Sequence, residues 1–293
     1  MDDFFSVALL TATLRASSPL IFAAMGGLLS ERSGVTNLAL EGLMLIGAFA
    51  AAFGSDLAGN AVAGLLIGVA AATAAALLFA VWAITLRADQ IVAGTAIVLL
   101  GSGLTAFLVQ RIWGQAGGSP TVARLPGIGN GLNVLVPVAL LLVPVVHVGL
   151  FHTKAGLRVM AAGEHPQAAE SVGINVARYR YACVLLSGVL SGLGGAYLSI
   201  GDLSAFSTDM TAGRGFIALA AVIFGNWTPF GALGAALLFG FAQALRFQVQ
   251  ALDLPISQDL IIALPYLLTL VAITGFVRHS RPPAGLGRHP TAH

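Results

Sequence analysis

Charged residues are scarce in this sequence: 9% of the 293 residues are Asp, Glu, Lys or Arg, whereas 57% are hydrophobic. The mean hydropathy is +0.91. A soluble domain carries about 25% charged residues. Because so few charges cannot cover a water-facing surface of normal size, the composition excludes a soluble globular protein and indicates an integral membrane protein. The 14 Lys and Arg residues are divided among short loops, so the net charge of +2 is better explained by orientation in a lipid bilayer than by binding to nucleic acid.

Cysteine and lysine occur only once each, and this scarcity excludes several kinds of functional site. With Cys183 alone, an intrachain disulfide and a Cys-rich metal site are impossible. Lys154 follows Thr153, whereas a P-loop requires Gly immediately before its Lys. We therefore expect no ATP site and no bound cofactor in this chain. The six histidines are scattered, which argues against a membrane enzyme with a metal or acid–base cluster.

Hydrophobic runs separated by short polar breaks predict an all-α, polytopic transmembrane bundle. A spanning helix needs about 20 apolar residues, which gives about eight or nine membrane segments. One run, 214–227, is too short to span alone; it is either a half-helix or a helix that begins inside the preceding loop. We expect one membrane domain over 1–277, with its longest polar loop at 152–181, and a disordered tail at 278–293. The nine runs cover residues 5–29, 36–53, 61–86, 90–110, 134–151, 182–200, 214–227, 231–250 and 260–277.

Positive charges predict the orientation. If the 152–181 loop is cytoplasmic, nine basic residues lie inside and two lie outside, which is a strong bias. This places the C-terminus in the cytoplasm and, with nine crossings, the acidic N-terminus outside. The inside set is Arg32, Arg87, Lys154, Arg158, Arg178, Arg180, Arg278, Arg281 and Arg288, and the outside set is Arg111 and Arg124.

Small residues four positions apart predict close helix contacts within the bilayer. The spacing occurs at Gly64 and Gly68, at Gly188 and Gly192, and at Ser191 and Gly195. Such pairs allow two helix backbones to approach each other in lipid.

The first polar constellation lies at the start of the second apolar run. Asn37 and Glu41 are four residues apart, so a helix would place them on one face. A carboxylate in an apolar run is costly and should face protein or water. One interpretation is a broken helix that lines a translocation path. The other is a structural cap in which Glu41 pairs with an arginine near the membrane boundary.

The second constellation lies in the 152–181 loop. Pro166 to Val172 is predicted to form a short helix, because Pro166 suits its first position and Gly173 follows its end. The helix is too short and polar to span a membrane. It could dock into the groove of a partner protein, or it could be a connector at the membrane surface.

These stretches resemble the permease subunits of ATP-binding-cassette importers in the ribose and branched-chain amino-acid group, and most closely the nucleoside and simple-sugar branch. The similar segments are 31–49, 89–96, 162–176 and 211–225, with 162–176 matching the cytoplasmic coupling segment of that branch. One departure is Val98, where an Asn is expected in this branch.

The resemblance implies a bacterial inner-membrane, multi-pass importer subunit. It implies two permease subunits, the second a different and longer chain, two cytoplasmic ATPases that use ATP, and an extracytoplasmic substrate-binding protein. The substrate path would include Asn37, Glu41, Thr95 and Asn226. Coupling to the ATPase would involve Gly163, Glu164, Pro166, Ala168, Ala169, Glu170 and Gly173.

An ion-coupled secondary transporter of small polar solutes is the alternative, since such proteins also use broken helices and binding sites at the membrane midplane. Few carboxylates lie inside the apolar runs, and no convincing inverted repeat is found. Asp202 and Asp209 fall in an outward loop, where solvation is the default interpretation and contact with a binding protein the other.

Overall fold

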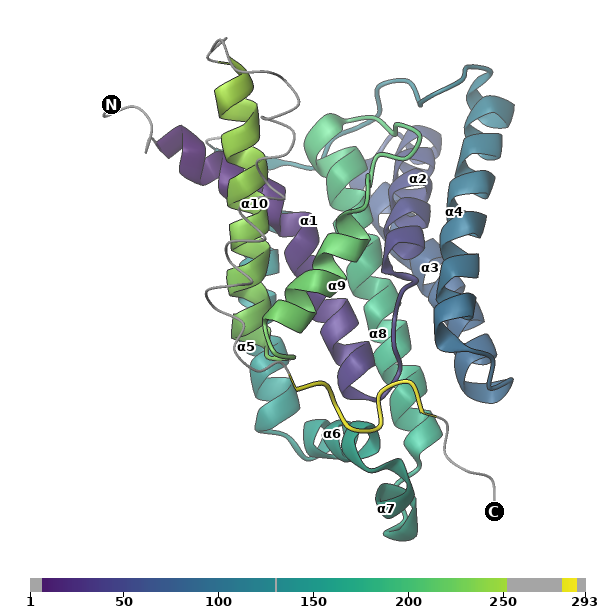
Figure 1. Ribbon diagram of the computed structural model, residues 1–293. Helices are drawn as coiled ribbons and strands as arrows, with labels where there is room; N and C mark the ends of the chain where they lie inside the picture. Colours follow the sequence, from purple (N-terminus) through teal and green to yellow (C-terminus); the bar gives the residue numbers. More distant parts are fainter. Residues whose placement is uncertain (1–6, 130, 252–280, 289–293) are drawn as a thin grey trace.

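A computed structural model describes residues 7–129, 131–251 and 281–288. The described chain is almost entirely helical, with one short antiparallel β-hairpin formed by Gly127–Gly129 and Leu132–Asn133 (Figure 1). The predicted all-α fold is therefore confirmed. The helices are α1 (Val7–Arg32), α2 (Leu40–Ala58), α3 (Ala61–Ala80), η1 (Val81–Thr85), α4 (Gln90–Trp113), α5 (Leu135–Phe151), α6 (Lys154–Glu164), α7 (Pro166–Ser171), α8 (Val176–Ala196), η2 (Tyr197–Leu203), α9 (Arg214–Phe224) and α10 (Pro229–Ala251).

The number of spans is lower than the sequence predicts. Within the described residues, six helices are long and apolar enough to cross a membrane, or seven if α5 and α6 count as one span bent by 74°. The sequence predicted eight or nine membrane segments, and the lower number has its cause in two short helices. The helix α9 has only 11 residues, and α5 has only 17 before the chain turns into α6. The ninth expected segment, 260–277, lies outside the described residues.

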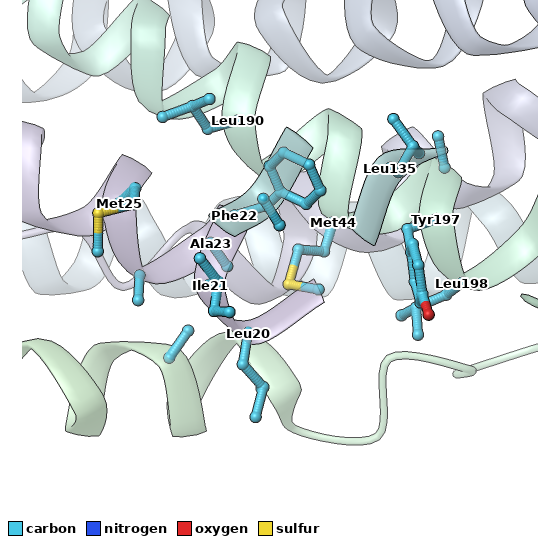
Figure 2. Packing of buried hydrophobic residues seen from close by; sticks show 14 of the residues in the cluster. Leu20, Ile21, Phe22, Ala23, Met25, Met44, Leu135, Leu190, Tyr197 and Leu198 are labelled. Carbon is cyan, nitrogen blue, oxygen red and sulfur yellow. The ribbon is translucent and has the colours of Figure 1, made fainter. Parts of the chain in front are cut away.

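The helix α1 is the centre of the bundle. Its run from Leu20 to Met25 is at most 1% exposed, so this part of the helix is buried on every side. Figure 2 shows Phe22 among side chains of other elements, including Met44 of α2 and Tyr197 of η2. A helix that is apolar all round belongs in the interior of a bundle. In contrast, α4 is peripheral, and its Leu99 and Phe107 are exposed.

The predicted small-residue contacts are present. A Cβ atom at Gly64 would lie 2.5 Å from the Ala51 carbonyl oxygen of α2, and one at Gly188 would lie 2.5 Å from Ala76 Cβ of α3. On α8, a Cβ at Gly195 would lie 2.0 Å from the Met44 carbonyl oxygen. These helices therefore pack with their backbones in contact, as the spacing predicted.

The bundle has two distinct ends. The helices α6 and α7 and residues 281–288 lie together at one end, which we call the α7 end (Figure 1). Residues 114–129 and 131–134, between α4 and α5, lie at the opposite end, which we call the far end. There they contact the last turn of η2, where Arg124 Nε donates to the Gly201 carbonyl oxygen.

Candidate functional site

The chain between α1 and α2, residues 33–39, is not helical and enters the bundle from the α7 end (Figure 1). Asn37 is fully buried there; its Nδ2 donates to Ser187 Oγ at 2.8 Å, and its Oδ1 accepts from the Ala39 amide at 3.2 Å. The Thr36 amide donates to Gln90 Oε1 of α4 at 2.7 Å. Irregular backbone at membrane depth persists only where such internal partners exist.

Glu41 connects the first turn of α2 to the start of α9. Its Oε1 accepts from the Gly213 amide at 2.8 Å, and its Oε2 accepts from the Gly215 amide at 2.5 Å. A Cβ on Gly215 would lie 2.3 Å from the Glu41 nitrogen, so the two helix N-termini are in direct contact. Each N-terminus carries a partial positive charge, which the carboxylate compensates. The hydrogen-bond donors to Glu41 are thus backbone N–H groups, and the arginine that the cap interpretation expected contributes only as the nearby charge of Arg214.

The helix α9 is a half-helix that begins at Arg214, which is the first of the two interpretations of the short apolar run. Both α2 and α9 begin inside the bundle rather than at its ends (Figure 1). Gly213, with φ of +80°, makes the turn from the 204–213 connection into α9. The Glu41 contact therefore joins two discontinuous helices in the interior, which is how binding sites are built in many transporters.

The other two predicted path residues lie elsewhere. Thr95 is on an exposed face of α4, and its hydroxyl donates to the Ile91 carbonyl oxygen of its own helix at 2.8 Å. Asn226 lies in the turn after α9, at the α7 end, and its Oδ1 accepts from the Arg281 amide at 2.9 Å. The four residues do not form one cluster, and their contact with substrate stays a prediction.

A cavity of about 330 Å³ lies near the far end, and its lining contains none of the residues predicted for the substrate path. Its lining includes Arg15 of α1, Asp202 of η2 and Arg214 of α9. Arg15 Nη2 lies 2.5 Å from Asp202 Oδ1. Asp202 was expected to be solvated in a loop, whereas it lies in η2 and belongs to a partly buried ion pair. In the sequence, Arg15 is the residue that could have indicated this cavity, because it is a charged residue within an apolar run.

The short helix predicted in the 152–181 loop is confirmed as α7. It begins at Pro166 and ends at Ser171, and Gly173 has the expected left-handed φ of +83°. Of the residues expected to couple to the ATPase, Ala168 and Glu170 are exposed, whereas Ala169 faces inward: it is 3% exposed and packs with Ala162 and Val176. A large side chain at Ala169 would disturb this internal packing rather than project towards a partner.

Gly163 and Glu164 face the chain itself. A Cβ on Gly163 would lie 2.1 Å from the Arg32 carbonyl oxygen, so α6 presses directly on the end of α1. Glu164 Oε1 lies 3.8 Å from Arg32 Nη1, and its Oε2 accepts from the Ala284 amide at 3.0 Å. These contacts connect the loop that carries α7 to the break between α1 and α2.

Residues 281–288 form a strap across the α7 end, which corrects the expectation of a disordered tail for this part (Figure 1). The Gly285 amide donates to the Gly163 carbonyl oxygen at 2.8 Å, and the Gly287 amide donates to that of Gly34 at 3.1 Å. Arg180, 2% exposed, donates to the carbonyl oxygens of Ser33 and Arg288. The strap therefore connects α6, the α1–α2 break and α8.

The turn after α9 is also joined to α1. Trp227 is buried, and its Nε1 donates to Glu31 Oε2 at 2.5 Å. Arg32 Nε donates to the Trp227 carbonyl oxygen at 2.7 Å. Movement of the α7 end would consequently reach the half-helix α9 through the end of α1.

The chain is similar to known transport proteins over nearly its whole length. The family model described as "Branched-chain amino acid transport system / permease component" matches residues 9–273. The guanosine ABC transporter permease protein NupQ of Bacillus subtilis is 41% identical, covering 94% of both chains. The nucleoside ABC transporter permease protein NupC of Lactococcus lactis is 37% identical, covering 92% of both chains.

A third relative has a sugar in its name. The glucose ABC transporter permease protein TsgB13 of Haloferax volcanii is 27% identical, covering 86% of this chain and 74% of its own length. No solved structure gives a significant match to the chain. The structure is a helical bundle with several candidate membrane spans, and the family model matches most of the chain. Both findings indicate a membrane transport protein. The protein is therefore an integral membrane protein of the branched-chain amino acid transport system permease family.

Proposed function

We propose that this chain is the permease subunit of an ATP-binding-cassette importer for nucleosides or related simple sugars. It works with a second permease, which is a different and longer chain, with cytoplasmic ATPases and with an extracytoplasmic binding protein. ATP is used by the ATPases, and this chain itself binds no cofactor. The observation that carries the proposal is the 37–41% identity to nucleoside transporter permeases over at least 92% of the chain.

The helix α7 supports the division of labour in this proposal. It lies outside the candidate spans and presents an exposed face. Val172, just after it, is 75% exposed, which suits burial against another protein. We assign this face, formed by Gln167, Ala168, Glu170, Ser171 and Val172, to ATPase docking and call it the docking face.

Movement at the docking face would reach the membrane interior through contacts already described. Ala169 fixes α7 to α8, and Gly163 presses on the end of α1. From there the break 33–39 leads to Glu41 and the start of α9. We propose that closure of the ATPases shifts α2 and α9 relative to each other, which opens or closes the solute path at their N-termini.

The transport test uses the full complex in proteoliposomes, with ATP inside the vesicles and the binding protein outside. Uptake of labelled guanosine or glucose should require ATP hydrolysis and should persist when proton and sodium gradients are collapsed. Uptake that follows an ion gradient without ATP would instead establish the secondary-transporter alternative. Absence of uptake for both solutes would reject the proposed substrate class.

The docking test compares three tryptophan substitutions. Ala168→Trp on the docking face should prevent co-purification of the ATPase without lowering thermal stability. Ala169→Trp should lower stability, because overpacking a buried position costs about 1–3 kcal/mol. Ala155→Trp, at an exposed position of α6, is the control and should change neither property. Normal ATPase binding by the Ala168 variant would show that docking occurs elsewhere.

A further inference from the structure

The cavity near the far end contains charged groups from three separate elements. Arg15 comes from α1, Asp202 from η2, and Arg214 from the first position of α9. The side chains of Arg15 and Asp202 are 42% and 27% exposed, so the pair is accessible rather than sealed in the core. Ionisable groups inside a membrane protein are costly, and they characteristically face a solute pathway or a water-filled cavity.

The arrangement leaves hydrogen-bonding capacity for a ligand. Arg15 Nε and Nη2 both donate to Asp202 Oδ1, at 3.2 and 2.5 Å, and within the described residues Oδ2 accepts no hydrogen bond. Arg214 uses Nη1 for the Met210 and Thr211 carbonyl oxygens, at 3.0 and 3.2 Å. A carboxylate oxygen accepts from a hydroxyl group while a neighbouring guanidinium donates to one, so the pair suits two adjacent hydroxyls.

The rest of the lining suits the remainder of such a solute. Gln243 of α10 supplies an amide that can both donate and accept, and Phe247, one turn later, is 60% exposed and offers an aromatic face. The volume of about 330 Å³ lies at the lower end of the range of small-molecule sites. The cavity also adjoins Met210, four residues before α9, so it leads to the helix that Glu41 holds.

We propose that this cavity is a solute-entry site that binds the vicinal hydroxyls of a nucleoside ribose or a simple sugar. Asp202 accepts a hydrogen bond from one hydroxyl, Arg15 donates a hydrogen bond to the neighbouring hydroxyl oxygen, and Gln243 and Phe247 contact the base or the far side of the sugar. The proposal rests on the proposed function for its solute class. It adds the residues that recognise the solute and places them at the end from which the binding protein would deliver it.

The test measures binding to the complex in nanodiscs without the binding protein, by saturation-transfer NMR with uridine, glucose and 2′,3′-dideoxyuridine. Wild type should bind uridine and glucose, and it should bind the dideoxy compound about 10- to 100-fold more weakly, the range for lost hydrogen bonds to charged groups. Asp202→Asn should weaken uridine binding by a similar factor and remove the difference between the two nucleosides. Asp56→Asn, an exposed carboxylate at the far end that lies outside the cavity, is the matched control and should behave as wild type.

Two further variants make the test independent of the Arg15–Asp202 ion pair. Gln243→Leu and Phe247→Ala should each weaken uridine binding but keep the preference over the dideoxy compound. Equal binding of both nucleosides by wild type, or unchanged binding in all three cavity variants, would overturn the proposal. Preferential binding of uridine monophosphate would also overturn it, by assigning an anion site. Failure of ATP-driven uptake by wild type would refute the proposed function instead, and would be seen separately in the proteoliposome assay.

Discussion

The substitution Glu41→Gln tests whether the carboxylate holds the two discontinuous helices together. The glutamine side chain keeps the shape of the glutamate but removes its charge. In the structure both carboxylate oxygens are used, by the amides of Gly213 and Gly215. An amide group has one acceptor oxygen, so its NH₂ group would face one of these two N–H donors. One backbone N–H at the start of α9 would then be buried without an acceptor.

The expected loss of stability follows from these contacts. A hydrogen bond to a charged group contributes about 1.5–3 kcal/mol, and an anion at a partly buried helix N-terminus contributes up to about 2 kcal/mol. Losing one such bond together with most of the charge–dipole interaction gives a total of about 3–5 kcal/mol. For a chain of this size, that loss lowers the melting temperature by roughly 10 °C.

The assay is thermal unfolding of the purified complex in detergent, followed by tryptophan fluorescence, together with ATP-driven uptake in proteoliposomes. Asp56→Asn, at an exposed position of the same helix, is the control and should stay close to wild type, because asparagine keeps an acceptor oxygen for its one donor, Trp113 Nε1. We expect the Glu41 variant to lose both stability and uptake. A melting temperature within about 2 °C of wild type would refute the argument, because it would correspond to less than about 1 kcal/mol.

The remaining predictions address packing, the strap and orientation. Gly215→Ala should lower the free energy of unfolding by about 1–3 kcal/mol in a thermal melt, because its Cβ would meet the Glu41 backbone. The control is Gly234→Ala, which lies in open space and should be neutral; equal effects of the two substitutions would contradict the contact. Deleting residues 281–293 should lower the free energy of unfolding by about 3 kcal/mol, because several hydrogen bonds of about 1 kcal/mol each are lost. The protein should still insert into the membrane, but uptake should be slower. Melting and uptake equal to wild type would show that the strap is dispensable. In a cysteine-free background, an impermeant thiol reagent should label Ala116→Cys but not Ser171→Cys in intact cells, and the reverse pattern would invert the orientation.

Local features of this protein could be predicted because neighbouring residues decide them. The apolar runs predict helices, since backbone groups in lipid must be satisfied within a segment. Pro166 and Gly173 mark the start and the end of α7, because proline lacks an N–H that the first turn does not need and glycine adopts a positive φ without strain. The glycine at 195 packs against another backbone, as its spacing from Ser191 indicates.

The partners of the polar side chains could not be predicted, because tertiary packing selects them from distant parts of the chain. Glu41 binds amides 172 and 174 residues away, although its sequence context is equally consistent with pairing to an arginine. Likewise, Arg15 and Asp202 are 187 residues apart and meet only because α1 packs against the end of η2. The sequence alone determined the membrane bundle and the loop helix, since both follow from local composition and spacing. Only the tertiary structure decided which charges compensate each other, because that depends on which helices lie side by side.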